Sequence, residues 1–300
     1  MLNQTQVWIR AARLRTLPLS VSGIIVGNAL CLSDLNFSWI LFVLLLLTAI
    51  SFQIISNLAN DYGDGVKGTD NEQRVGPERV LQAGLLSRGA LKKGIVVSAT
   101  VALVLALGAI FYAFGTTSWT YVLIFLGLSV LSVWAAITYT VGEGAYGYRG
   151  WGDFFVLLFF GGLSVMGSYF VQLKTINSMS FLLALVVGLL SVGVLNLNNM
   201  RDHENDAAVG KRTLAVLLGD KAKAYHLFLI GGALAVLFGV FFYTQFKFYW
   251  LPFLVAFPLM IHLRVVLKNK ISKDLDPELK KLAGTTFLLS LLIFITLYLG

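Results

Sequence analysis

The sequence contains 300 residues, of which 57% are hydrophobic and only 13% are charged, and its mean hydropathy is +0.80. Soluble globular domains carry roughly 25% charged residues, so this composition excludes a soluble protein and indicates a polytopic membrane protein. The single cysteine, Cys31, excludes an internal disulfide and a cysteine-based metal cluster. No Pro- or Ser-rich linker divides the chain, so we expect one membrane domain over residues 1–300.

Nine apolar segments predict an all-α fold of nine transmembrane helices around a central cavity. Most segments approach the ~20 residues that a helix needs to cross the hydrocarbon core, and the first and last are short. The segments are 17–33, 38–60, 94–114, 118–140, 154–172, 179–199, 225–245, 248–267 and 284–299. No small-residue cleavage site follows the first segment, so we expect it to remain as a membrane helix rather than a signal peptide.

The basic residues divide very unequally between the two faces of this nine-helix arrangement. Of the 23 Lys and Arg residues, 21 fall on the same face as the N-terminus, and only Lys174 and Lys247 fall on the other. Basic residues stay on the cytoplasmic side, so the N-terminus is predicted inside and the C-terminus outside. The net charge of +8 therefore reports topology, and nucleic-acid binding is not expected.

The first dense polar cluster is NLANDYGDGVKGTD, residues 57–70, at the cytoplasmic end of the second span. If the helix continues through this stretch, Asn57, Asp61 and Asp64 lie at i, i+4 and i+7, on one helical face. Three glycines are expected to end the helix and to turn Asp70 back toward that face. These glycines are Gly63, Gly65 and Gly68.

The second cluster is NLNNMRDHENDAAVGKRT, residues 196–213, after the sixth span. Asn198, Asp202 and Asp206 are spaced i, i+4 and i+8, again on one helical face. Each cluster follows the second helix of a set of four spans, which indicates two four-helix repeats plus one further helix. Such a repeat would bring the two acidic faces together across the cavity.

Three interpretations of the acidic clusters compete. The carboxylates are either solvated loop residues paired with nearby bases, or part of a proton or ion pathway, or ligands for hard divalent cations. The spans are nearly free of ionisable groups at mid-membrane, which argues against a proton pathway. Two matching clusters argue against chance loop composition. Mg²⁺ binds through carboxylates together with substrate phosphates, so a diphosphate held by two or more Mg²⁺ ions fits best.

Basic residues near both clusters are expected to bind the diphosphate oxygens. They are Lys67, Arg74, Arg79, Arg201, Lys211 and Arg212. A mixed acidic and basic site beside an apolar cavity suits a diphosphate that carries a long apolar tail. Phe-rich runs such as FFVLLFFGG, residues 154–162, are candidates to line the tail groove, although a Phe run in a membrane helix commonly faces lipid.

These motifs resemble those of the UbiA superfamily of intramembrane prenyltransferases, which carry an NDxxD-type motif after the second helix and a DxxxD motif after the sixth. Here the motifs read NDYGD at 60–64 and DHEND at 202–206. Within the superfamily, NDYGDGVKGTD, GPERVLQAG and YTVGEGAYGYRGWGD are most similar to the 1,4-dihydroxy-2-naphthoate polyprenyltransferase branch. Many members place an acid four residues after Asp64, where this chain has Gly68 and then Asp70.

The resemblance implies a Mg²⁺-dependent transfer of a polyprenyl chain from polyprenyl diphosphate to 1,4-dihydroxy-2-naphthoate, with loss of diphosphate and CO₂, in menaquinone biosynthesis. It also implies an integral protein of the bacterial inner membrane, in contact with membrane lipid. The implied metal ligands include four aspartates that are also catalytic, namely Asp61, Asp64, Asp202 and Asp206. The other implied metal ligands are Asn60, Asp70 and Asn198, with Asn57 as a further metal or phosphate ligand.

Aromatic residues near the predicted cavity mouth are candidates to stabilise the allylic cation, because ring faces attract cations. Tyr139 is the favoured one, since it ends a helix; interfacial anchoring is the alternative for each tyrosine. Tyr146, Tyr148 and Arg149 are candidates to bind the acceptor. Arg149 would hold the naphthoate carboxylate, although a purely topological role fits it equally well.

Two other classes of membrane protein share some of these features. A CDP-alcohol phosphotransferase would show D-G-x-x-A-R, but here Asp64-Gly65 is followed by VKGT, so this class is excluded. A transporter would carry charges within its spans, and none is evident. Among enzymes, the alternative is a UbiA-type prenyltransferase that uses 4-hydroxybenzoate or another aromatic acceptor.

Overall fold

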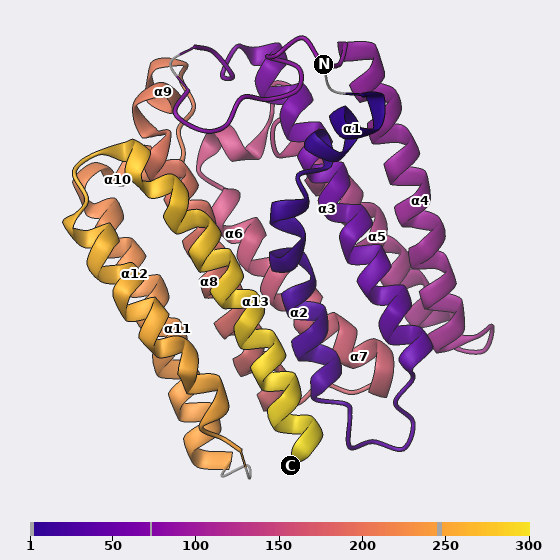
Figure 1. Ribbon diagram of the computed structural model, residues 1–300. Helices are drawn as coiled ribbons and strands as arrows, with labels where there is room; N and C mark the ends of the chain where they lie inside the picture. Colours follow the sequence, from indigo (N-terminus) through magenta and orange to yellow (C-terminus); the bar gives the residue numbers. More distant parts are fainter. Residues whose placement is uncertain (1–2, 73, 245–247) are drawn as a thin grey trace.

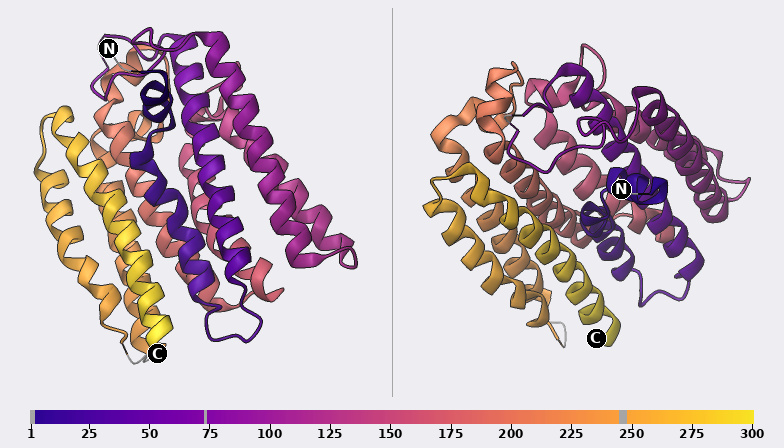
Figure 2. Two further views of the ribbon diagram at one scale, coloured as in Figure 1. Left: turned by 45° about the vertical axis from the view of Figure 1, so that its right-hand side comes forward. Right: turned by 45° about the horizontal axis from the view of Figure 1, so that its top comes forward.

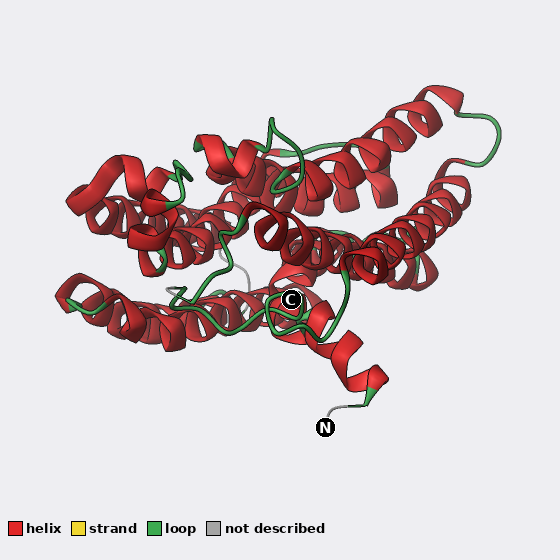
Figure 3. Cartoon of the chain, turned by 90° about the horizontal axis from the view of Figure 1, so that it is seen from above, coloured by secondary structure: helices red, strands yellow, loops and turns green. Residues whose placement is uncertain are grey.

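The computed structural model describes residues 3–72, 74–244 and 248–300, which form a bundle of long helices (Figure 1). The α-helices are α1 Gln4–Ala12, α2 Leu17–Ala29, α3 Trp39–Lys67, α4 Arg88–Phe114, α5 Trp119–Thr138, α6 Gly152–Val156, α7 Ser168–Leu173, α8 Ser178–Arg201, α9 His203–Ala208, α10 Leu214–Leu218, α11 Ala222–Thr244, α12 Ala256–Lys268 and α13 Asp276–Leu299. A π-helical segment, η3, spans Leu157–Gly167 between α6 and α7. The described residues contain no strand (Figure 3), which confirms the all-α prediction.

Eight helical segments of the described chain are long and apolar enough to cross a membrane, and they match eight of the predicted spans in order. The remaining span, 17–33, forms α2, which is only 13 residues long. After Ala29 the backbone changes to tighter turns, in which the Cys31 N–H donates to the Asn28 carbonyl at 3.0 Å and the Leu32 N–H donates to the Ala29 carbonyl at 3.2 Å. Lys247 and residue 245 of the predicted seventh span lie outside the described residues.

The helices place both acidic segments at one end of the bundle. In Figures 1 and 2, α1, α9 and the loop that follows α3 gather at that end, opposite the C-terminus of α13. Helix α2 lies against both α3 and α13. Helix α13, the last of the chain, therefore borders α2, which forms the first predicted span, close to the acidic segments.

Helix α3 continues through Lys67, so the prediction that Gly63 and Gly65 end it is wrong. Only Gly68, with φ of +74°, terminates the helix. The other two glycines permit close packing instead. A Cβ on Gly63 would lie 2.5 Å from Thr140 Oγ1, and one on Gly65 would lie 2.6 Å from Leu81 Cδ2.

The prediction that Asn198, Asp202 and Asp206 share one helical face is also wrong. Helix α8 ends at Arg201, Asp202 adopts φ −98° and ψ 8°, and α9 begins at His203. The Asp202 carboxylate accepts hydrogen bonds from the neighbouring Arg201 guanidinium, the kind of local side-chain bonding that favours helix ends over helix interiors. The Asp206 N–H still donates to the Asp202 carbonyl at 2.8 Å, which keeps the two aspartates close.

Small residues allow η3 to pack tightly on α8. A Cβ on Gly161 would lie 2.5 Å from the Ala184 carbonyl oxygen and 2.9 Å from Gly188 Cα, whereas a Cβ on the neighbouring Gly162 would meet only Leu158 Cδ1, at 3.8 Å. The close approach of two backbones at glycine is a common means of joining membrane helices.

We therefore predict that Gly161→Ala destabilises the protein by about 1–3 kcal/mol, as expected for overpacking. Gly162→Ala is the matched control and should be neutral or slightly stabilising, since alanine favours helix more than glycine does. Thermal unfolding of the purified proteins in detergent measures both. Equal midpoints for the two variants would contradict the packing described for η3 and α8.

Candidate active site

A cavity of about 430 Å³ begins among the polar residues at the acidic end of the bundle and continues between apolar helix faces. Most of the predicted polar site residues line it. They are Asn57, Asn60, Asp64, Asp70, Arg74, Arg79, Asn198, Arg201, Asp202, Asp206 and Lys211. Tyr139 and Tyr146 line it as well. Both acidic clusters thus contribute to one cavity.

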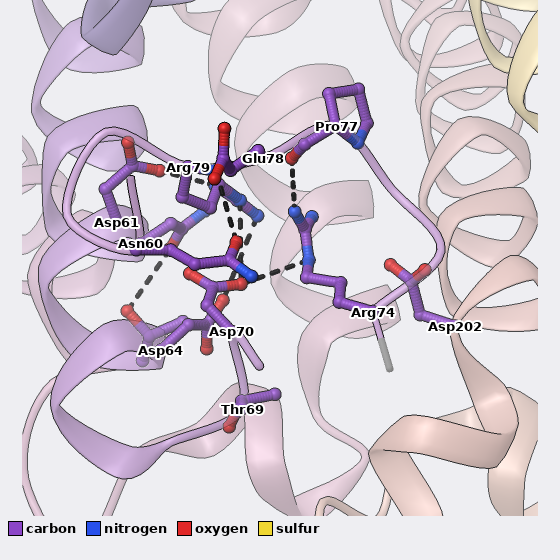
Figure 4. A network of polar contacts seen from close by, with 12 residues as sticks. Asn60, Asp61, Asp64, Thr69, Asp70, Arg74, Pro77, Glu78, Arg79 and Asp202 are labelled. Carbon is purple, nitrogen blue, oxygen red and sulfur yellow. Dashed lines mark hydrogen bonds and ion pairs between the residues drawn. The ribbon is translucent and has the colours of Figure 1, made fainter. Parts of the chain in front are cut away.

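Arg79 lies at the centre of the first acidic cluster (Figure 4). Its guanidinium is 2.6 Å from Asp61, 3.9 Å from Asp64 and 3.8 Å from Asp70. Asp61 also pairs with Arg13, from the segment before α2. All three aspartates are buried, and buried carboxylates require counter-charges, so Arg79 holds this cluster together.

Arg74 is the second base of this cluster. Its Nε is 3.0 Å from Asp70, and its Nη1 donates to the Pro77 carbonyl at 2.6 Å (Figure 4). The loop after α3 therefore folds back over the helix end, and Asp70 faces the cavity together with Asp64.

Tyr148 connects Asp64 to the surrounding loops. Its hydroxyl donates to Asp64 Oδ1 at 2.7 Å and lies 2.5 Å from Thr69 Oγ1. The ammonium groups of Lys67 and Lys211 lie 4.0 and 5.2 Å from its ring centroid, within cation–π range.

Arg201 organises the second acidic cluster. It donates to both carboxylate oxygens of Asp202, at 3.0 and 2.6 Å, and to Asn198 Oδ1 at 2.9 Å. Its third partner is Asp276, at 2.6 Å, in the first turn of α13. The last membrane helix thus contributes directly to the polar end of the cavity.

One buried hydrogen bond joins the two clusters. Asn205 Nδ2, on α9, donates to the Thr69 carbonyl at 2.9 Å. Lys211 adds charge between them, because it lies 3.5 Å from Asp206 and over the Tyr148 ring that bonds Asp64. The two segments, about 140 residues apart in sequence, form one polar site.

The charges of this site favour an anion. Among the described residues, the cavity lining includes seven basic side chains and five acidic ones, an excess of two positive charges. The basic residues are Arg13, Arg15, Arg74, Arg79, Arg201, Lys211 and Lys280, and the acidic ones are Asp64, Asp70, Asp202, Asp206 and Asp276. A site for cations alone would carry the opposite excess.

The carboxylates differ in how completely they are neutralised. Burial and the nearby Asp64 charge raise the pKa of Asp70 to about 7, and burial raises the pKa of Asp206 to about 6 despite Lys211. Burial opposes ionisation of Asp202 too, but the hydrogen bonds and charge of Arg201 outweigh it and lower its pKa. Asp70 and Asp206 are therefore less completely neutralised than Asp202, although each has a basic partner.

Buried oxygens of the same two residues lack an aligned hydrogen bond in the described chain: they are Asp206 Oδ2 and both carboxylate oxygens of Asp70, whose Oδ1 nevertheless forms the ion pair with Arg74. No group of three or more His, Cys, Asp or Glu side chains within the described ranges is spaced to hold a metal ion, because arginines occupy the space between the carboxylates. The donors fit Mg²⁺ in the manner of a site that binds through one or two carboxylates and substrate phosphates.

Several predicted residues lie away from the cavity lining. Asp61 borders a separate small hollow beside Arg13 and Arg79, and Lys67 is exposed. Arg149 and Arg212 are exposed too, and the Arg149 guanidinium donates only to the Glu143 carbonyl, at 3.5 Å. Tyr148 reaches the site through Asp64 rather than through the lining.

Sequence reasoning missed four charged residues of the lining. Arg13 and Arg15 precede the first span, and Asp276 and Lys280 begin the last. Because they lie outside the two motifs, their charges were interpreted only as evidence of topology. Their location on the same predicted membrane face as both motifs could have indicated that they belong to the site. It also missed a buried chain of contacts in which His226 lies 2.9 Å from His262, whose Nδ1 lies 2.6 Å from Glu278.

We predict that Tyr148→Phe destabilises the protein by about 1.5–3 kcal/mol, because Asp64 loses a hydrogen bond to a charged, buried oxygen. Tyr62→Phe is the control: the Tyr62 ring lies near Lys92, and its hydroxyl has no hydrogen bond within the described chain. That change should stay within about 0.5 kcal/mol. Thermal unfolding measures both variants, and an unchanged midpoint for Tyr148→Phe would refute the role of its hydroxyl.

Comparison with known proteins agrees with this geometry. The UbiA prenyltransferase family matches residues 20–296. The chain is 39% identical to the 1,4-dihydroxy-2-naphthoate octaprenyltransferases of Escherichia coli, covering 100% of this chain and 97% of that protein, and of Haemophilus influenzae, covering 98% and 96%. A UbiA homologue from Archaeoglobus fulgidus, solved with DMAPP and Mg²⁺, shares the fold with a TM-score of 0.63 at 15% identity, over 96% of this chain and 99% of that one. The chain belongs to the UbiA prenyltransferase family.

Proposed function

We propose that this protein transfers a polyprenyl chain from polyprenyl diphosphate to 1,4-dihydroxy-2-naphthoate, with release of diphosphate and CO₂, to give demethylmenaquinol in menaquinone biosynthesis. The observation that carries the proposal is one cavity with two parts. Its polar end has paired acidic clusters and an excess of positive charge, and its remainder is apolar and lies between helices. The near full-length similarity to naphthoate octaprenyltransferases supports this acceptor.

In this proposal the polar end holds the diphosphate. Asn60, Asp64, Asp70, Asn198, Asp202 and Asp206 are the candidate ligands for two or more Mg²⁺ ions, since all line the cavity. When bound, Mg²⁺ would neutralise the charge that develops on the departing diphosphate. Arg74, Arg79, Arg201 and Lys211 would donate hydrogen bonds to the same phosphate oxygens.

Asp61 has a different proposed part. It is buried, lies outside the cavity lining and pairs with both Arg13 and Arg79. We therefore assign it the task of orienting Arg79 toward the diphosphate. This positioning role makes direct metal contact by Asp61 unnecessary.

An aromatic wall next to the polar end suits the allylic cation that forms when the diphosphate leaves. Tyr139 packs edge-on against Tyr146 with centroids 5.4 Å apart, and Tyr146 stacks on Phe155 at 4.1 Å. All three line the cavity. Their ring faces attract a cation, and the apolar walls around it limit the water that could quench it. We do not assign the acceptor carboxylate to Arg149, which is exposed and outside the lining.

We place the protein in the bacterial inner membrane with its polar end toward the cytoplasm. The supporting observation is the distribution of Lys and Arg, 21 of 23 of which fall on the face of the N-terminus.

The proposal predicts metal-dependent release of labelled CO₂ from 1,4-dihydroxy-2-naphthoate carrying a ¹⁴C carboxyl group, together with a prenylated quinol, by purified protein in nanodiscs with polyprenyl diphosphate. EDTA should abolish release. Asp64→Asn and Asp202→Asn should each lower kcat/KM by about 100-fold or more, because each removes charge stabilisation of the leaving group.

Asp274→Asn, an exposed change near the start of α13, is the matched control and should retain activity. Prenylation of 4-hydroxybenzoate without CO₂ release from the naphthoate would show that the acceptor is wrong while the reaction class stands. Release that persists in EDTA, or in either aspartate variant, would contradict the proposed use of both clusters.

A further inference from the structure

The apolar part of the cavity follows one face of α5 from the polar site toward the opposite end of the bundle. The residues that line it there are Phe125, Leu128, Ser129, Ser132, Ala135 and Ala136 on α5 and Tyr139 just after it. These positions recur every three or four residues, which describes one continuous helical stripe. The 14 residue steps from Phe125 to Tyr139 correspond to about 21 Å at 1.5 Å per residue.

Two neighbouring segments line the same length of the cavity. On α3 the lining runs from Asp64 to Leu45, and along the continuous α6, η3 and α7 segment it runs from Phe155 to Val171. In contrast, α4 contributes only near its far end, through residues 106, 109 and 110. The cavity is therefore an elongated groove with a polar end and a distinct far end.

Side-chain size changes along the α5 stripe. Between the two aromatic residues at its ends, the lining consists of Leu128 and four small residues, Ser129, Ser132, Ala135 and Ala136. These small side chains leave room along the groove. Phe125 is the first large ring that the stripe reaches beyond them.

Packed rings close the space behind Phe125. Its ring stacks on Phe170 at 5.7 Å and lies 5.3 Å from Phe114, and Tyr121 meets Phe170 edge-on at 5.2 Å. The lining residues Ile110 and Val171 beside it are 4% and 3% exposed. The groove thus ends on a close-packed cluster contributed by α4, α5 and α7.

A buried polar network reinforces the same end. Gln172, next to Val171, donates to Asn28 Oδ1 at 2.8 Å and to the Ser38 carbonyl at 2.9 Å, and its Oε1 accepts from the Ser38 N–H at 3.1 Å. These bonds tie α7 to α2 and to the start of α3. Moving α7 away from this end of the groove would break these satisfied, buried hydrogen bonds, which is costly.

We propose that Phe125 is a specificity-determining residue that ends the prenyl-tail groove, so that the protein recognises only the first four or so isoprene units of its donor. This inference rests on the proposed function. Each unit adds four chain bonds of about 1.5 Å, or about 5 Å when extended, so a groove of about 21 Å accommodates about four units. The cavity is partly open to its surroundings, so further units turn out of the groove at Phe125 and contribute little to recognition.

The test measures kcat/KM for all-trans diphosphates of two, three, four, six and eight units, with the naphthoate acceptor and Mg²⁺. For the unaltered protein, kcat/KM should rise by at least tenfold per unit up to four units, as burial of apolar carbons predicts, and then level off. Phe125→Ala should move the levelling point to longer donors, and Phe125→Trp should move it to shorter ones. Leu123→Ala, on the same helix but 62% exposed, is the control and should leave it unchanged.

Thermal stabilisation of each variant by the same diphosphates with Mg²⁺ provides a readout without turnover. The same length dependence should appear there, even if the acceptor is misassigned. Identical length profiles for Phe125→Ala and Phe125→Trp would overturn the inference, as would a steady rise from two to eight units in the unaltered protein. Length-dependent binding without product would contradict only the proposed reaction.

Discussion

Carboxylates buried near the ends of α3 and α8 need counter-charges, and this requirement shapes the whole polar end of the bundle. Taking a charge out of water costs several kcal/mol unless a partner compensates it. Arg79 meets that need for Asp61, Asp64 and Asp70, and Arg201 meets it for Asp202. Because Arg13 and Asp276 complete these pairs, the segments at both ends of the chain are drawn to the same site.

This charge balance also explains how one site can accept both metal and diphosphate. The arginines that neutralise the carboxylates are also the groups able to contact phosphate oxygens when cations take their place. Asp206 Oδ2 and both oxygens of Asp70 lack an aligned hydrogen bond, and an excess of positive charge remains at the cavity. The site thus combines partners for a divalent cation and for a polyanion, beside a groove that accepts an apolar tail.

Local pattern predicted much of the fold and of the site, whereas contacts between distant segments escaped it. Hydropathy located the membrane helices because each must present apolar side chains along its length. The i, i+4, i+7 spacing placed Asn57 and Asp64 correctly because α3 does continue, but Gly63 and Gly65 were misread since glycine serves close packing as well as turns. The break at Asp202 and the contributions of Arg15 and Asp276 depend on tertiary neighbours, which no spacing within one segment reveals.

The central claim is that both acidic clusters bind one metal–diphosphate unit. The most direct measurement titrates Mn²⁺, in place of Mg²⁺, into the purified protein and follows the free ion by electron paramagnetic resonance, with and without a non-hydrolysable thio analogue of geranyl diphosphate. If both clusters bind one metal–diphosphate unit, two or more ions should bind per chain only with the analogue, and Asp64→Asn and Asp202→Asn should each abolish this binding. Tight binding of the metal that survives in either variant, or that ignores the analogue, would contradict it.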